Sequence, residues 1–86
     1  MNNELFSLYT ADKGELANQP KVNTSAYIAM RRRDLERRAR VLELLAANEL
    51  HTAEDYYHAA WIINHGDTAE DARSAHLLAL RASGLG

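Results

Sequence analysis

The sequence contains no cysteine, one proline and four glycines in 86 residues, and only 7% of its residues are Phe, Trp or Tyr. The absence of cysteine excludes disulfide bonds, cysteine zinc sites and thiol nucleophiles. There is also no run of about 18 apolar residues, which a membrane-spanning helix requires, and no basic, apolar start typical of a signal peptide. We therefore expect a small cytoplasmic protein that does not act on a membrane.

Neither sign of charge dominates the chain. Ten Lys and Arg stand against 12 Asp and Glu, which leaves a net charge of −2. This balance disfavours a generally basic nucleic-acid binder and an acidic tail. The hydrophobic content of 47% is sufficient for one core in a chain of this length.

Three segments have the signals of helices: a residue that can cap the N-terminus, apolar residues at helical spacing, and no internal proline. The predicted helices cover about residues 25–48, 53–65 and 68–82. The string Thr-Ala-Glu-Asp, a variant of the capping box, occurs at 52–55 and again at 68–71. The predicted fold class is therefore all-α, a small helical bundle with a C-terminal antiparallel helical hairpin.

The first 24 residues carry weaker signals. Four apolar residues near the start fit one short amphipathic helix, namely Leu5, Phe6, Leu8 and Tyr9. Lys13 and Gly14 are expected to interrupt it, and Pro20 disfavours helix at the residue before it. We interpret 1–24 as an N-terminal arm or linker with a short helix, and 25–86 as the helical domain.

The predicted helix 25–48 combines an apolar stripe with a run of arginines. Ile28, Leu35 and Leu42 recur every seven residues and are expected to face the core. Residues 31–40 contain six arginines and two acids. They could bind phosphate, but no glycine-rich element or aromatic residue is interleaved with them, so we favour a solvated face with ion pairs four residues apart. The pairs expected are Arg32–Glu36, Asp34–Arg38 and Glu36–Arg40.

Arg31 and Arg38 border the apolar stripe, each three residues after one of its members. An unpaired charge at a packed edge is costly, so each is expected to meet an acid or a bound anion. Asp55 and Glu54 of the next helix are the natural acidic partners. A structural salt bridge is favoured over an anion site.

The histidines supply the candidates for chemistry. His58 and His65 share a helix face, but seven residues place them about 10 Å apart along the axis, too far to chelate one ion. We therefore predict no metal and no cofactor. His76 lies among apolar neighbours and is expected to be a hydrogen-bonded core residue, or to face His58 across the hairpin with Asp55 orienting one ring. The candidate catalytic residues are His58, His76, Asp55 and His65.

The second and third predicted helices carry more apolar surface than a small bundle can cover. Tyr57 and Trp61 lie on nearly the opposite face of the predicted helix 53–65 from Tyr56. Leu78 lies away from the side of the predicted helix 68–82 that is expected to pack. We expect a second copy or another protein chain to contact Tyr57, Trp61 and Leu78. Alternatively, the N-terminal arm folds back and covers them.

The segment Asp55-Tyr-Tyr-His-Ala-Ala-Trp-Ile-Ile-Asn-His-Gly, with Ala75-His-x-Leu-Ala79 after it, resembles an uncharacterised bacterial helical domain family. The family pattern is D-Y-Y-H-A-A-x-I-x-Q-H-G-x-T-x-x-D and then A-H-x-L-A, and the match covers about 34–86. This chain has Asn64 where the family has Gln, and the family's further C-terminal helix and F-G-T-Q-like motif are absent. The resemblance implies the fold but no activity. It singles out Asp34, Arg37, Asp55, His58, His65, Gly66 and His76.

Two functional hypotheses follow. The first is a small helical module that binds another protein chain or itself. The alternative is a small enzyme, or a subunit of one, that uses His58, His76 and Asp55 as an acid–base cluster. A solvent-accessible pocket in which these three side chains converge would favour catalysis, and a filled core around them would favour a structural role.

Overall fold

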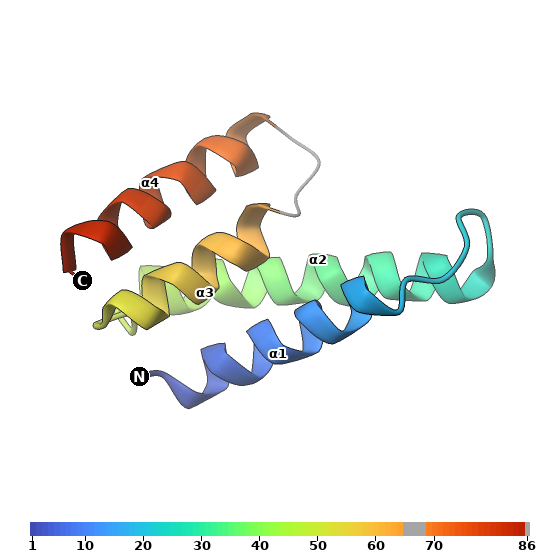
Figure 1. The fold of residues 1–86 in the computed structure, drawn as a ribbon, viewed down its shortest axis with the longest axis horizontal. Helices are drawn as coiled ribbons and strands as arrows, with labels where there is room; N and C mark the ends of the chain where they lie inside the picture. The colour runs from blue at the N-terminus through green and yellow to red at the C-terminus, as the bar shows by residue number, and fades with distance from the viewer. Residues whose placement is uncertain (65–68, 86) are drawn as a thin grey trace.

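Four helices make up the computed structural model, which describes residues 1–64 and 69–85 (Figure 1). The helices are α1 (Asn3–Ala17), α2 (Ser25–Ala46), α3 (Ala53–Asn64) and α4 (Ala69–Leu85). The described residues contain no strand, and α3 and α4 run antiparallel as a hairpin. The predicted all-α bundle is therefore confirmed. The last helix continues to Leu85, beyond its predicted end at about residue 82.

The predicted caps of α2 and α3 form as expected. The Thr24 hydroxyl accepts a hydrogen bond from the Tyr27 amide at 3.1 Å. Asn48, just beyond α2, has φ 62°, the left-handed conformation that asparagine tolerates. At the start of α3, the Asp55 amide donates to the Thr52 hydroxyl and the Thr52 amide donates to the Asp55 carboxylate, a complete capping box. The connection between the predicted helices 53–65 and 68–82 falls within residues 65–68, outside the described residues.

Helix α1 differs from the expected arm. It passes through Lys13 and Gly14 without interruption, and the Asn2 side chain caps it by accepting a hydrogen bond from the Leu5 amide at 2.9 Å. Glycine within a helix costs only about 1 kcal/mol. Burial of Leu5 and of Asp12 on one side of α1 outweighs that cost. The connecting segment is therefore 18–24, shorter than the arm or linker predicted over 1–24.

Helix α3 is the centre of the core. It packs against each of the other three helices, whereas α4 packs against α3. Ile62 and Ile63 of α3 are fully buried. The other core side chains come from all four helices and the α2–α3 connection, and include Leu5, Val41, Leu44, Leu50, Ala75 and Leu78.

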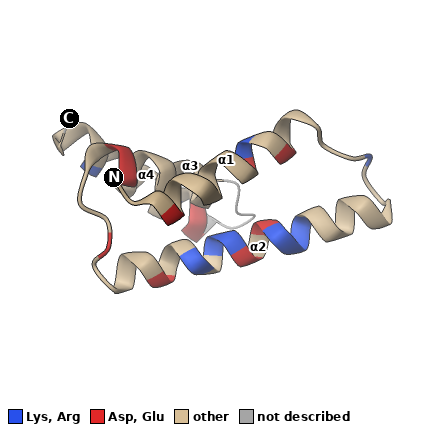
Figure 2. Cartoon of the chain, turned by 90° about the horizontal axis from the view of Figure 1, so that it is seen from below, with Lys and Arg blue, Asp and Glu red and all other residues tan. Residues whose placement is uncertain are grey.

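Helix α2 buries a different stripe from the one predicted. Its buried residues are Met30, Asp34, Arg37, Val41 and Leu44. Ile28, Leu35 and Leu42 are instead 58%, 59% and 48% exposed. They face outward because α2 runs along one side of the molecule, with the other helices packed on its opposite face (Figure 2).

Candidate functional site

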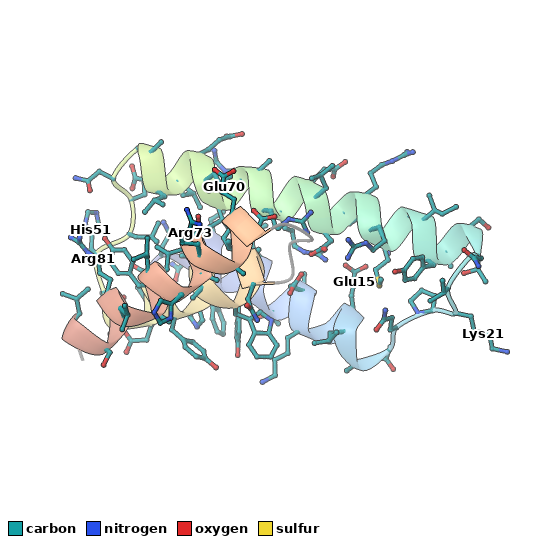
Figure 3. All side chains as sticks on the ribbon, turned by 90° about the horizontal axis from the view of Figure 1, so that it is seen from above. Glu15, Lys21, His51, Glu70, Arg73 and Arg81 are labelled. Carbon is teal, nitrogen blue, oxygen red and sulfur yellow. The ribbon has the colours of Figure 1, made fainter. Side chains whose placement is uncertain are left out.

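A buried ionic cluster joins α1 to α2. Asp12, Asp34 and Arg37 are 3%, 6% and 8% exposed. The Arg37 guanidinium donates to the Asp12 carboxylate at 3.2 Å and lies 2.6 Å from the Glu15 carboxylate. Glu15 projects from α1 towards α2 (Figure 3) and also accepts a hydrogen bond from Arg33 at 2.7 Å. This cluster holds α1 against the inner face of α2.

The arginines at the edge of this cluster pair within their own helix. Arg38 donates to Asp34 at 2.6 Å, which confirms the predicted Asp34–Arg38 pair, and Arg31 donates to the same oxygen at 3.4 Å. The expectation that Asp55 or Glu54 would pair with Arg31 and Arg38 is not met by any interaction of the described residues. Asp55 is instead engaged by backbone amides.

The carboxyl groups of Asp12 and Asp34 meet inside the cluster. Both carboxyl groups are buried, with Arg37 against Asp12 and Arg38 against Asp34. Burial and this neighbouring carboxyl raise the pKa of Asp34 above its usual value, against the lowering effect of Arg38. A cavity of about 70 Å³ lies beside the pair, which has room for water but not for a metabolite.

Asp55 has a structural position at the N-terminus of α3. Its carboxylate accepts hydrogen bonds from the backbone amides of Asn2 at 2.7 Å, His51 at 3.1 Å and Thr52 at 3.3 Å. Burial raises the pKa of Asp55, but the hydrogen bonds from these amides and from the Thr52 hydroxyl outweigh it and lower the pKa overall. Asp55 is therefore an ionised cap that ties the start of α1 to α3.

His58 lies in an aromatic cluster. Its ring stacks on Tyr9 with 4.4 Å between centroids, and the Phe6 and Tyr57 rings lie within 5.5 and 5.9 Å. Its Nδ1 is buried and has no hydrogen-bond partner among the described residues. Burial lowers the pKa of His58, against the opposing effect of the Asp55 and Glu54 charges. The surroundings thus favour a neutral imidazole.

The expected convergence of His58, His76 and Asp55 is not found. His76 is exposed rather than in the core, because it lies at the open rim of the α3–α4 hairpin and not at its packed centre. His76 borders a shallow groove of about 310 Å³ between α3 and α4 whose other walls are Tyr57, Ala60, Trp61, Asn64, Ala72, Ala75 and Ala79. His58 and Asp55 do not line it. His65 lies outside the described residues.

The predicted contact residues are divided between core and surface. Tyr57 is 51% exposed, as expected. Trp61 is half-buried, and its ring lies edge-to-face with the Tyr9 ring, with 5.7 Å between the centroids. Helix α1 therefore covers part of this surface, which was the alternative prediction. Leu78 is 7% exposed and belongs to the core, so its assignment to the surface was wrong. It faces the α3 side of the hairpin.

The largest departure from the sequence analysis is the outer face of α2, defined here by Ile28, Leu35, Ala39 and Leu42. These residues are exposed and lie nearly opposite the inner stripe of the helix. Beside them, Arg32 and Glu36 form no ion pair within the described part of the chain. The predicted Arg32–Glu36 and Glu36–Arg40 pairs are therefore not formed, because Arg40 binds Glu4 and Glu43 instead.

The acids of α1 were not recognised from the sequence as site residues. Asp12 and Glu15 fell in the segment interpreted as a linker. A signal was present, because Leu5, Tyr9 and Asp12 follow helical spacing and place an acid beside the apolar positions.

The described residues contain neither a candidate metal site nor a membrane-spanning helix, and comparison with known proteins gives no match. Within residues 1–64 and 69–85 no group of three or more His, Asp or Glu side chains could hold a metal ion. None of the described helices is long and apolar enough to cross a membrane. No protein-family model matches the chain, and no curated protein and no solved structure is significantly similar to it.

Proposed function

We propose that this chain is a small helical module that acts by self-association through the outer face of α2. The observation that supports the proposal is the exposure of Ile28, Leu35 and Leu42 at intervals of seven residues along one helix. Isolated exposed leucines are common on protein surfaces. A row of aliphatic residues with this spacing is instead the pattern by which two helices pack together.

The buried polar groups support this proposal over the acid–base enzyme. Asp55 is saturated by backbone amides, His58 is enclosed by aromatic rings, and His76 lies in a separate groove. The Asp12–Asp34 pair lies beside a cavity that is too small for a metabolite. These groups stabilise the fold, and the apolar surface remains for a binding function.

We also propose that the chain belongs to the bacterial helical domain family that it resembles. Four of the residues singled out by the resemblance are buried polar groups in this fold, namely Asp34, Arg37, Asp55 and His58. Each makes contacts that a helical bundle of this arrangement needs. This supports a shared fold, with the family pattern marking structural positions.

Light scattering after size exclusion tests self-association. At micromolar concentration, the expected mass is a multiple of the 9.7 kDa of one chain. Leu35→Glu should give a monomer, because it places a charge in the proposed contact. Leu80→Glu is the matched control, since Leu80 is similarly exposed but lies on α4.

Two outcomes would contradict the proposal. The first is a wild-type chain that remains a monomer at all accessible concentrations. The second is an oligomer that survives Leu35→Glu but is lost in Tyr57→Glu, which would place the contact at the groove between α3 and α4.

A further inference from the structure

The outer face of α2 has charged residues of opposite sign along one edge. At about 100° per residue, Arg32 and Glu43 fall within about 20° of each other, three turns and about 16 Å apart along the axis. Both are exposed, and Arg32 has no ion pair within the described residues, whereas Glu43 accepts a hydrogen bond from Arg40 at 2.8 Å. This edge of the apolar row thus begins with the basic Arg32 and continues with the acidic Glu36 and Glu43.

We propose that two copies of this chain pair α2 against α2 in antiparallel orientation, with Leu35 of each copy opposite Leu42 of the other. This inference rests on the proposed function and adds the orientation and register of the contact. A twofold axis then crosses α2 between residues 38 and 39. It brings Arg32 of one copy within about 3 Å, along the axis, of the level of Glu43 in the other.

Charge complementarity selects the antiparallel arrangement. In a parallel pair with the same apolar row, the edge that carries Arg32 would face the opposite edge of the other copy, which carries Arg31 and Arg38, so positive charges would lie together. In the antiparallel pair, Arg32 of each copy lies instead beside Glu43 of the other, which places opposite charges together on this edge. It also sets the dipoles of the two helices in opposition, which is the favourable arrangement for neighbours.

The other helices pack on the inner face of α2, so its outer face remains accessible to a second copy. Its core residues Val41 and Leu44 pack towards α3, and Arg37 holds α1 on the same side. Helix α2 therefore lies at one side of the molecule, with its outer face free of the other described helices (Figures 2 and 3). A second copy can approach without displacing any of them.

Cysteine cross-linking tests the orientation, and the absence of native cysteine makes single-cysteine variants unambiguous. Ala39 lies beside the proposed twofold axis, so the two Ala39→Cys positions differ by only about 1.5 Å along the axis. Ala39→Cys should form a disulfide-linked dimer under mild oxidation. The two Ile28→Cys positions would lie about 31 Å apart in the antiparallel pair, so Ile28→Cys should stay uncross-linked.

The outcomes separate the register from the proposed function. Cross-linking of both variants would indicate a parallel pair and overturn this inference, while self-association through α2 would stand. A dimer that neither variant cross-links would overturn the register and place the contact elsewhere. A monomer would overturn the proposed function itself.

A charge reversal gives a second, independent readout. Arg32→Glu should weaken dimerisation by about threefold to tenfold, because two exposed pairs become repulsive. The double variant Arg32→Glu with Glu43→Arg should recover most of the loss. Arg73→Glu on α4 is the control for the change in net charge. Failure of the double variant to recover would contradict the proposed pairing of these two edges.

Discussion

At the scale of single residues, the buried charges of Asp55 and Arg37 have specific partners, whereas the Nδ1 atom of His58 has no hydrogen-bond partner among the described residues. The ring packs between Tyr9 and Phe6 as a flat apolar group would. Protonation would place a positive charge in this enclosed position. His58 therefore contributes to stability in its neutral form.

This gives a pH dependence with a defined sign. Because the pKa of His58 is lowered in the folded chain, the unfolded chain binds the proton more readily, so stability falls as the pH decreases through 6.5. Chemical denaturation at pH 7.5 and 5.5 should show this loss in the wild type. His58→Phe, which keeps a stacking ring, should lose less. Parallel losses in the two proteins would contradict the assignment.

Asp55 is the second residue whose contribution to the stability of the fold can be measured. Asp55→Ala removes three backbone hydrogen bonds and should lower the free energy of unfolding by about 1–3 kcal/mol. Glu54→Ala is the control, because Glu54 is exposed on the same turn. Since the pKa of Asp55 is lowered, its contribution is present above about pH 4 and is lost on further acidification. Equal stability of the two variants at pH 7 would show that Asp55 is not the anchor of the N-terminus.

At the scale of the helices, the existence of α2, α3 and α4 was predictable from the sequence, but the full length of α1 and the side of α2 that faces the core were not. The caps at Thr24 and Thr52 fixed the starts of α2 and α3 because capping depends on nearby residues only. The facing of α2 depends on α1. Arg37 becomes a core residue only once Asp12 and Glu15 neutralise it, and those acids lie more than 20 residues away.

The ion pairs between α1 and α2 provide a matched comparison of buried and exposed charge. Arg37→Met removes the guanidinium from the buried Asp12 carboxylate, which should cost about 3 kcal/mol or more, whereas Glu15 keeps its hydrogen bond from Arg33. Arg40→Met removes the exposed pair with Glu4 between the same two helices and should leave the melting temperature nearly unchanged. Thermal melts of the two variants decide the point. Similar losses would mean that the buried cluster does not hold α1 in place.

At the scale of the whole molecule, the all-α bundle and its C-terminal hairpin follow from local patterns, but the candidate site does not. Seven-residue spacing identified Ile28, Leu35 and Leu42 as one face, yet α2 has a second stripe that competes for the core. The second stripe is buried because its charges find partners on α1. Leu78 and His76 exchanged their expected positions because α4 packs through the side that carries Ala75 and Leu78, and local spacing does not determine which side of a helix is packed.

Self-association through the outer face of α2 links the stability of the molecule to its concentration. If folded copies pair, a hundredfold dilution should lower the melting temperature by about 5 °C, because dilution favours the dissociated, unfolded chains. Leu35→Glu should abolish this dependence and change the melting temperature of the dilute protein little, since Leu35 is exposed in the single chain. Leu80→Glu should retain the dependence. A wild-type melting temperature that is independent of concentration would show that the exposed row of α2 belongs to a monomer.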